Sequence, residues 1–204
     1  MLDSMLRPII DPPLNMMATL LKKTPVTGNL LTVMGFGYGI VACLAIAFSF
    51  PIVALIFLIL NRICDGLDGA VARAKGQASD FGGYLDIVLD FFIYAGFPLA
   101  AAFGIGGEGA LLIAAFVLFS IITTGVSFLA YAIIAAKRGM DDNAHQGKKS
   151  FFFSNGLMEG TETIIFLILL CILPMYFIEI GFVFGVLCLL TTLLRIKMAY
   201  TVFS

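Results

Sequence analysis

Charged side chains are scarce in this sequence. Only 12% of its 204 residues are Asp, Glu, Lys or Arg, where a soluble domain has about 25%, and 61% are hydrophobic. This composition excludes a disordered chain. The net charge of −1 gives no excess of positive charge for nucleic acid, so we expect no nucleic-acid partner. The composition predicts an integral membrane protein in which the few charges mark the working parts.

The sequence also lacks paired cysteines. Its cysteines are far apart inside apolar stretches, and no two of them form a C-x-x-C pair (Cys43, Cys64, Cys171 and Cys188). This pattern argues against a zinc site and against a disulfide framework. We therefore expect the four cysteines to be small residues of the core.

Long apolar segments fill most of the chain. About 20 apolar residues in a helix span the hydrocarbon core of a bilayer. The segments that meet this requirement are residues 29–49, 51–72, 82–103, 109–136, 158–175 and 177–198. We therefore predict an all-α polytopic membrane protein with six transmembrane helices in a single domain over residues 1–204.

The first 23 residues have a different pattern. Apolar and charged residues mix there, without the uninterrupted apolar run of a cleaved signal peptide. The pattern predicts an amphipathic helix on the membrane surface, broken near Pro12 and Pro13. The six-helix core then covers residues 24–204.

The positions of the cations predict the orientation of the helices. With six spans, all twelve Lys and Arg residues fall on one side of the membrane, and the opposite loops carry only Glu108 and Glu179. The positive-inside rule then places both termini in the cytoplasm.

Aspartates and small residues line up at the cytoplasmic ends of the second and third predicted spans. At about 100° per residue, Asp65, Asp68, Gly69 and Ala72 fall on one stripe of the second span, with Arg73 beside it.

A matching stripe on the third span consists of Gly82, Asp86 and Asp90 at i, i+4 spacing. Because the connection between the two spans is short, we expect the helices to be antiparallel neighbours. The four aspartates would then converge close to the membrane surface.

Converging carboxylates repel one another, so they need cations to stay ionised. Their hard oxygen atoms suit Mg²⁺ or Mn²⁺, which also bind substrate phosphates. Gly69 and Gly82 leave room for a bulky ligand, and Arg73 offers a planar fork for phosphate oxygens. We therefore predict a metal-dependent site for a diphosphate group.

The alternative is a set of solvated helix caps and loop charges. It is weak for Asp86 and Asp90, because each unpaired carboxylate inside an apolar helix costs about 2.5–3.5 kcal/mol.

This segment resembles the signature of the CDP-alcohol phosphatidyltransferases. The family pattern is D-x-x-D-G-x-x-A-R, eight residues, then G-x-x-x-D-x-x-x-D, and residues 65–90 match it without a mismatch. Two further stretches, K-S-F-F-F-S-N-G-L-M-E-G-T-E-T and L-D-I-V-L-D-F-F-I-Y, are similar to a subgroup of bacterial inner-membrane members. The resemblance implies transfer of a phosphatidyl group from CDP-diacylglycerol to a small alcohol, with release of CMP, in phospholipid biosynthesis.

The resemblance also implies roles for individual residues. Asp65, Asp68 and Asp86 would ligate Mg²⁺ or Mn²⁺, and Asp90 would act as the general base and join the metal ligands. The segment T-G-N-L-L-T resembles the family's T-P-N-x-V-T, with Gly28 in place of Pro. The implied nucleotide-binding residues are Asn29, Thr32, Asp65, Gly69, Ala72, Arg73, Ser79 and Gly82.

The same resemblance implies a homodimer surrounded by membrane lipids in a bacterial inner (cytoplasmic) membrane. Its active site would face the cytoplasm. A soluble CDP-alcohol with diacylglycerol is the alternative donor arrangement.

The acceptor alcohol has a weaker signal. Glu159 and Glu162 lie at the start of the fifth predicted span, where they could bind a cationic head group. Carboxylates at a helix N-terminus also complement its macrodipole without any ligand. We find no certain basic residue for a phosphorylated alcohol, and we expect the polar loop with His145, Lys148 and Lys149 to be solvated.

Two other classes of function use similar residues. A membrane prenyltransferase also binds a diphosphate through Asp-rich motifs and Mg²⁺, but it would need more spans. A cation transporter would place carboxylates near the bilayer midplane, often in repeated halves, whereas here they lie at one face.

Overall fold

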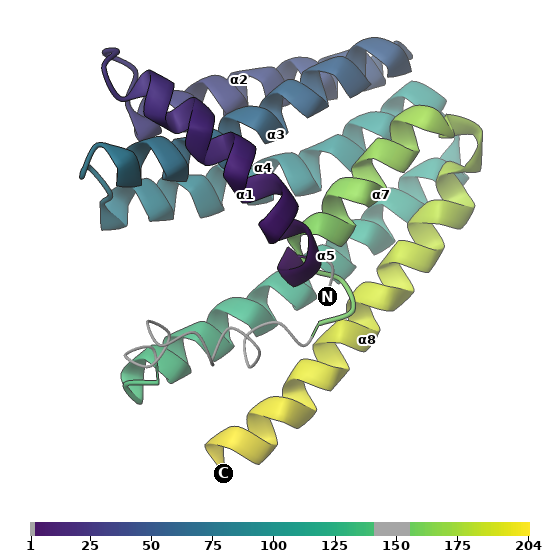
Figure 1. Ribbon diagram of the computed structural model, residues 1–204. Coiled ribbons are helices and arrows are strands. Elements are labelled where there is room, and N and C mark those ends of the chain that lie inside the picture. The colour runs from purple at the N-terminus through teal and green to yellow at the C-terminus, as the bar shows by residue number, and fades with distance from the viewer. Residues whose placement is uncertain (1–2, 141–155) are drawn as a thin grey trace.

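The computed structural model of the chain describes residues 3–140 and 156–204, and every regular element in these ranges is a helix (Figure 1). The elements are α1 (Asp3–Leu21), α2 (Gly28–Ala47), α3 (Pro51–Ala74), α4 (Asp80–Ile105), α5 (Glu108–Lys137), α7 (Gly160–Ile172), the 3₁₀ turn η2 (Pro174–Tyr176) and α8 (Phe177–Phe203). The all-α prediction is confirmed for the described part of the chain.

Each predicted transmembrane segment corresponds to a helix, but these helices differ in length and polarity. Four of them, α2, α4, α5 and α8 with η2, are long and apolar enough to cross a bilayer. Helix α3 carries Arg62 at its middle and Asp65, Asp68 and Arg73 in its C-terminal half, and α7 is a shorter apolar helix of 13 residues. The structure is that of a polytopic membrane protein, and the count of six spans stays a prediction.

The short length of α7 has a local cause. Leu173 has φ −127° and ψ 56°, outside the helical region. It precedes Pro174, and a proline ring disfavours the helical conformation of the residue before it. The helix therefore ends at Ile172 and not at the predicted residue 175. Its 13 residues rise about 20 Å, less than the roughly 30 Å of a bilayer core.

The helices form three hairpins, α2–α3, α4–α5 and α7–α8, whose reversals lie at the same end of the molecule (Figure 1). The hydroxyl of Ser49 donates to the carbonyl oxygen of Gly104 at 3.0 Å, which ties the first reversal to the end of α4. Gly109 at the start of α5 lies beside Ile178 at the start of α8. The α1–α2 and α3–α4 connections and the C-terminal ends of α5 and α8 therefore lie away from the reversals.

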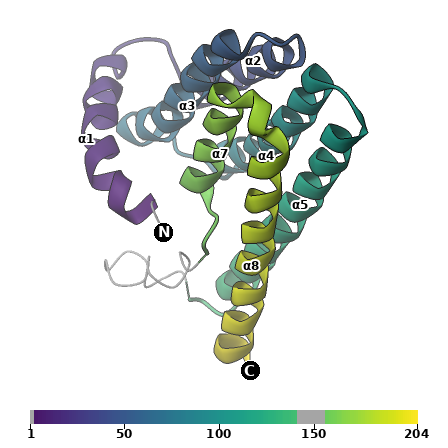
Figure 2. The same ribbon diagram turned by 90° about the vertical axis from the view of Figure 1, so that its right-hand side faces the viewer.

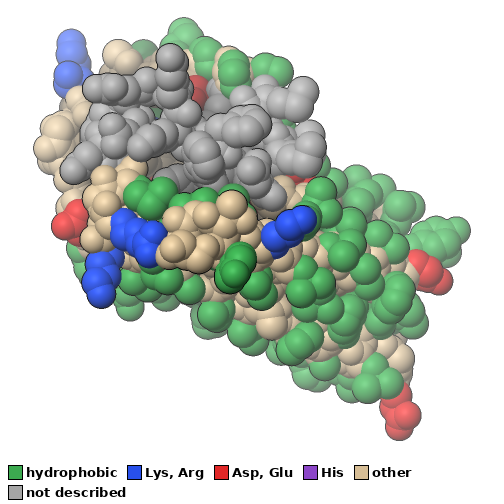
Figure 3. Space-filling view, turned by 90° about the horizontal axis from the view of Figure 1, so that it is seen from below, with side chains coloured by type: hydrophobic (Ala, Val, Ile, Leu, Met, Phe, Trp, Pro, Cys, Tyr) green, Lys and Arg blue, Asp and Glu red, His purple; other side chains and the backbone are tan. Residues whose placement is uncertain are grey.

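Charges are distributed between these two ends as the sequence predicts. Lys23, Lys75 and Arg138 lie away from the reversals, whereas Glu108 and Glu179 begin helices at the reversals. Figure 3 shows hydrophobic side chains covering much of the surface toward the reversals, with Lys and Arg side chains toward the other end. Which end faces the cytoplasm stays a prediction. The loop residues His145, Lys148 and Lys149 lie outside the described residues.

The core lies where the hairpins meet. Phe97 of α4, Leu58 of α3 and Leu167 of α7 are fully buried, and the rings of Phe166 and Phe184 stack with centroids 3.8 Å apart. All belong to one cluster of buried side chains. Many other large apolar side chains of these helices face outward, as expected for a surface that contacts lipid.

Helix α1 is continuous, so the predicted break near Pro12 and Pro13 is wrong. Each proline removes one backbone hydrogen bond but does not have to end a helix. Here residues 8–13 are exposed, so the carbonyl groups that lose a partner can bond to water or lipid head groups. Leu14 and Ala18 pack on α3, and Figure 2 shows α1 at one side of the bundle, away from α5 and α8.

The contact of α4 with the end of α2 gives a test of the fold. A Cβ atom at Gly104 would lie 2.4 Å from the carbonyl oxygen of Ile46, so Gly104→Ala must push the two backbones apart. We expect this variant to lose about 1–3 kcal/mol of stability, seen as a lower midpoint of thermal unfolding in detergent. Gly37→Ala is the matched control, because nothing lies within 4 Å of a Cβ atom there. Equal midpoints for the two variants would contradict the packing described here.

Candidate active site

The predicted site lies between helices α2, α3 and α4. Helix α2 packs against both of the others, whereas α3 and α4 have little direct backbone contact among the described residues. The polar stripes of α3 and α4 face each other as expected, and side chains meet between them, but their backbones do not pack closely. Glycines on α2 explain the arrangement, since a Cβ atom at Gly35 would lie 2.9 Å from Cys64 of α3 and one at Gly39 would lie 2.5 Å from Ile93 of α4.

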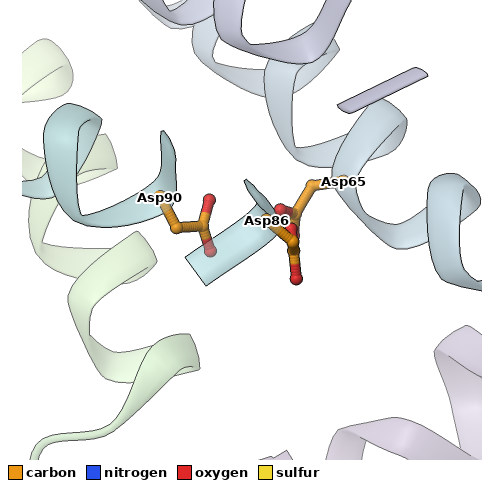
Figure 4. A group of neighbouring side chains, drawn as sticks. All are labelled: Asp65, Asp86 and Asp90. Carbon is orange, nitrogen blue, oxygen red and sulfur yellow. The ribbon is translucent and has the colours of Figure 1, made fainter. Parts of the chain in front are cut away.

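Carboxylates from α3 and α4 meet across the space that α2 closes. Carboxylate oxygen atoms of Asp65, Asp86 and Asp90 all lie within 4.8 Å of one another. Figure 4 shows Asp65 coming from α3, and Asp86 and Asp90 coming from α4 one turn apart. All three residues are half-buried. A group of hard oxygen ligands with this spacing fits Mg²⁺ or Mn²⁺, so the donor set agrees with the predicted metal.

Asp68, the fourth predicted ligand, lies outside this cluster of three. Its Oδ2 atom accepts a hydrogen bond of 2.6 Å from the hydroxyl of Thr32 on α2, and its Oδ1 atom accepts one from the backbone N–H of Gly69. Both carboxylate oxygens of Asp68 are thus engaged by the protein. Its role as a metal ligand stays a prediction.

A pocket of about 250 Å³ opens beside the acidic cluster. Its walls come from the first turns of α2, the last turns of α3, the connection between α3 and α4, and the first turns of α4. The lining residues are Gly28, Asn29, Thr32, Asp68, Gly69, Ala72, Arg73, Gln77, Ala78, Ser79, Gly82, Gly83 and Asp86. Every predicted nucleotide-binding residue lines this pocket except Asp65, which lines the adjoining small cavity with Asp86 and Asp90.

Small residues and a helix cap shape the pocket wall. A Cβ atom at Gly82 would lie 3.0 Å from Oδ1 of Asn29, and one at Gly69 would lie 3.0 Å from Nη1 of Arg73. The hydroxyl of Ser79 caps α4 by accepting from the N–H of Gly82 at 3.1 Å. The pocket is also lined by Gln77, Ala78 and Gly83. These residues belong to none of the sequence motifs described above, so only the pocket itself identifies them.

The sequence analysis also missed the cationic partner of the acidic cluster. Arg62 of α3 donates from Nη2 to Oδ1 of Asp90 at 2.6 Å and from Nη1 to the hydroxyl oxygen of Tyr94 at 3.0 Å. It was counted among the cations of the cytoplasmic face, yet it lies 12 residues before the end of α3, about 18 Å along the helix. Two signals in the sequence could have indicated it: its i, i+3 spacing from Asp65 and its position inside an apolar helix.

A second buried arginine lies between α5 and α8. Arg195 is 6% exposed and donates from Nη1 to the carbonyl oxygen of Thr124 at 3.0 Å and to the hydroxyl of Ser127 at 2.8 Å. Neither Arg195 nor Arg62 lines the pocket or the cavity of the acidic cluster, so the expectation of no certain basic residue for a phosphorylated alcohol stays a prediction.

The predicted acceptor residues have a structural role at the start of α7. The side chain of Glu159 accepts from the N–H of Gly156 at 3.1 Å, and that of Glu162 accepts from the N–H of Glu159 at 3.2 Å. Together they form a capping box, which satisfies N–H groups that a helix start leaves without partners. These contacts agree with the alternative interpretation, in which the two carboxylates stabilise the N-terminus of α7 without a ligand. Recognition of an acceptor alcohol by Glu159 and Glu162 stays a prediction.

Comparison with known proteins identifies the family. The model of the CDP-alcohol phosphatidyltransferase family matches residues 26–202. The inner membrane protein YnjF of Escherichia coli (strain K12) is 43% identical over 98% of this chain and 96% of its own length. The archaetidylinositol phosphate synthase of Pyrococcus horikoshii is 38% identical over 43% of this chain and 46% of its own length.

The fold also has a counterpart among solved structures. The crystal structure of Mycobacterium tuberculosis phosphatidylinositol phosphate synthase with CDP-DAG bound superposes with a TM-score of 0.60, covering 92% of this chain and 94% of that one at 18% identity. At this identity the likeness concerns the fold alone. Because the family model covers most of the chain and a relative matches nearly all of it, the chain belongs to the CDP-alcohol phosphatidyltransferase family of membrane-bound enzymes.

Proposed function

We propose that this enzyme transfers a phosphatidyl group from CDP-diacylglycerol to the hydroxyl group of a small alcohol and releases CMP. The observation that carries the proposal is the continuity of the two spaces: Thr32 and Asp86 line both the pocket and the cavity of the acidic cluster. A diphosphate whose nucleotide occupied the pocket would therefore extend toward the cluster. Membership in the family argues against a prenyltransferase and a cation transporter.

The pocket residues suit a nucleotide diphosphate. Asn29 offers hydrogen bonds for a base or ribose, and Gly69, Ala72 and Gly82 keep the wall free of large side chains. No ion pair or hydrogen bond links the guanidinium of Arg73 to another described residue, which leaves its fork available for phosphate oxygens. Ser79 holds the first turn of α4 in position.

The acidic cluster would supply the chemistry. With Asp65, Asp86 and Asp90, and with Asp68 as the predicted fourth ligand, a bound Mg²⁺ or Mn²⁺ would polarise the diphosphate and neutralise charge on the departing CMP. In the transfer, a bond forms between the acceptor oxygen and the phosphorus of the phosphatidyl group. The bond from that phosphorus to the oxygen of CMP breaks, and the hydroxyl proton passes to Asp90.

The geometry of Asp90 is compatible with this role as general base. A carboxylate offers about four acceptor positions. Arg62 and Tyr94 occupy three of them, at 2.6, 3.4 and 2.9 Å. The remaining position, and the one that makes only the long contact of 3.4 Å, are open to a metal ion and the acceptor hydroxyl, while the two close contacts hold the carboxylate still.

For the arrangement in the membrane we propose what the sequence predicts. We infer one membrane domain with six spans, α1 on the surface, both termini and the site in the cytoplasm, and the bacterial inner membrane as its location. The cations at the end away from the reversals support this orientation. We also infer a homodimer that takes its donor from the surrounding membrane lipids.

Replacement of the general base gives the most direct test. We expect Asp90→Asn to lower CMP release by at least about 10²-fold, because the amide cannot take the proton. Binding of a CDP-containing nucleotide, measured by calorimetry in detergent, should stay within error of the unmodified protein. Asp80→Asn is the matched control, an exposed aspartate in the first turn of α4. Turnover of Asp90→Asn like that of the control would exclude Asp90 as the base.

The metal requirement is tested by removal and restoration. Treatment with EDTA should abolish CMP release, and added Mg²⁺ or Mn²⁺ should restore it. Asp86→Asn should weaken Mn²⁺ binding by at least about tenfold, since it removes a ligand, as measured by the electron paramagnetic resonance signal of free Mn²⁺. Full activity in EDTA, or unchanged Mn²⁺ binding in the variant, would contradict the proposed metal site.

The acceptor is tested with two substitutions at Glu162. Glutamine retains the oxygen that accepts from the N–H of Glu159 but removes the charge, whereas alanine removes both. If Glu162 only caps α7, Glu162→Gln should keep its acceptor preference and its stability, and Glu162→Ala should lose about 1 kcal/mol of stability. A rise in KM for cationic alcohols alone in Glu162→Gln would instead support recognition of a cationic head group.

The assay for these variants compares CMP release with serine, ethanolamine, choline, inositol and glycerol phosphate, with CDP-diacylglycerol as donor. Inositol phosphate is added to these five alcohols because of the name of the Pyrococcus relative. If only anionic alcohols are accepted, Glu159 and Glu162 are not the recognition residues.

A further inference from the structure

The guanidinium of Arg62 is surrounded by polar groups from two helices. Its Nε atom donates to Oδ1 of Asn61 at 2.7 Å, and its Nη2 atom donates to Oδ1 of Asp90 at 2.6 Å. Its Nη1 atom faces the hydroxyl of Tyr94 at 3.0 Å, Oδ2 of Asp90 at 3.4 Å and Oδ2 of Asp65 at 3.5 Å. All three nitrogen atoms of the Arg62 guanidinium thus have protein partners, two of them carboxylates, which makes it a poor site for a substrate anion.

The arrangement ties three helices together at this point. Asn61 is 3% exposed and donates from Nδ2 to the carbonyl oxygen of Gly35 on α2 at 2.9 Å. Its own Oδ1 atom therefore faces Arg62 in a fixed orientation. Tyr94, one turn after Asp90 on α4, donates its hydroxyl to Oδ2 of Asp90 at 2.9 Å and places its ring 5.4 Å from the guanidinium carbon. The carboxylate of Asp90 is thus restrained from two directions.

The charge of Arg62 matters as much as its hydrogen bonds. Its side chain is 12% exposed and that of Asp90 is 22% exposed, so water screens their interaction poorly. The guanidinium is the cation in direct contact with the cluster among the described residues, and it touches two of the three carboxylates there. It therefore reduces the negative charge that attracts a divalent cation to the same place.

We propose that Arg62, assisted by Tyr94, is a positioning residue for Asp90 and limits how strongly the acidic cluster binds divalent cations. The guanidinium holds Asp90 in the orientation in which it receives the acceptor proton. It also keeps one carboxylate of the cluster balanced by a charge of the protein. The positioning half rests on the proposed function, whereas the effect on cation binding does not require that any reaction take place.

Removal of the positive charge of Arg62 should strengthen cation binding but lower the catalytic rate. In Arg62→Gln the cluster becomes more negative, so Mn²⁺ binding should tighten by at least about fivefold. Asp90 loses its orientation, so kcat should fall by at least about 10²-fold with little change in KM for CDP-diacylglycerol. If Arg62 only stabilised the fold, its replacement would loosen the site and lower both the affinity for Mn²⁺ and kcat.

A charge-conserving variant and a matched control complete the experiment. Arg62→Lys should bind Mn²⁺ like the unmodified protein and regain part of the lost kcat, because lysine restores the charge but not the planar fork. Arg138→Gln makes the same chemical change at an exposed arginine and should alter neither property. Mn²⁺ binding is measured on the full chain in detergent without lipid donor, so it can be read even if no CMP release is found.

Mn²⁺ binding in Arg62→Gln that is unchanged or weaker excludes the electrostatic role, and kcat like that of Arg138→Gln excludes the positioning role. If Arg62→Gln does not fold, Tyr94→Phe tests the positioning role, since it removes one hydrogen bond to Asp90 and no charge. It should lower kcat by about tenfold with unchanged Mn²⁺ binding, and unchanged kcat would exclude the positioning role.

Discussion

Mutual repulsion of carboxylates in poorly hydrated surroundings is the constraint on which the rest of this structure depends. Asp65, Asp86 and Asp90 come within 4.8 Å of one another between apolar helices. Such a cluster persists only if positive charge balances it, because like charges at short range are poorly screened there. The chain supplies part of this charge through Arg62, and the donor set is suited to a divalent cation for the rest.

The helices are arranged so that this cluster can form. Glycines on α2 let α3 and α4 approach it closely from two directions, at Gly35 and Gly39. Because both helices pack on α2 rather than on each other, a space remains between their polar stripes. The pocket occupies this space, and Thr32 of α2 reaches into it to bond Asp68. The small residues of α2 thus determine both how the three helices pack and where the pocket lies.

The lipid environment explains where polar groups occur in the rest of the chain. Apolar side chains cover the outer surface, and the reversals of the three hairpins carry Glu108 and Glu179 with no basic residue beside them. Inside the bundle, the described charges are engaged: Arg62 with the cluster, and Arg195 with Thr124 and Ser127. Burial of a charge without partners is costly, and each buried arginine accordingly donates hydrogen bonds to oxygen atoms of the protein.

The sequence by itself determined the helices, the membrane class, the family and most residues of the pocket. These depend on periodicity and on spacing along one helix, and side chains three or four residues apart share a face wherever that helix packs. Two helix ends differ from the prediction by more than two residues: Pro174 shortens α7, and α8 continues to Phe203 beyond the predicted residue 198. Pro12 and Pro13 left α1 continuous.

Only the tertiary structure decided which groups meet across helices. It separated α3 from α4, engaged Asp68 with Thr32, and joined Arg62 to Asp90, residues 28 positions apart. None of these contacts has a signal in local periodicity, because each depends on how closely two helices approach and how they are rotated. Packing sets both of these, and here small residues such as Gly35 and Gly39 permit the approach.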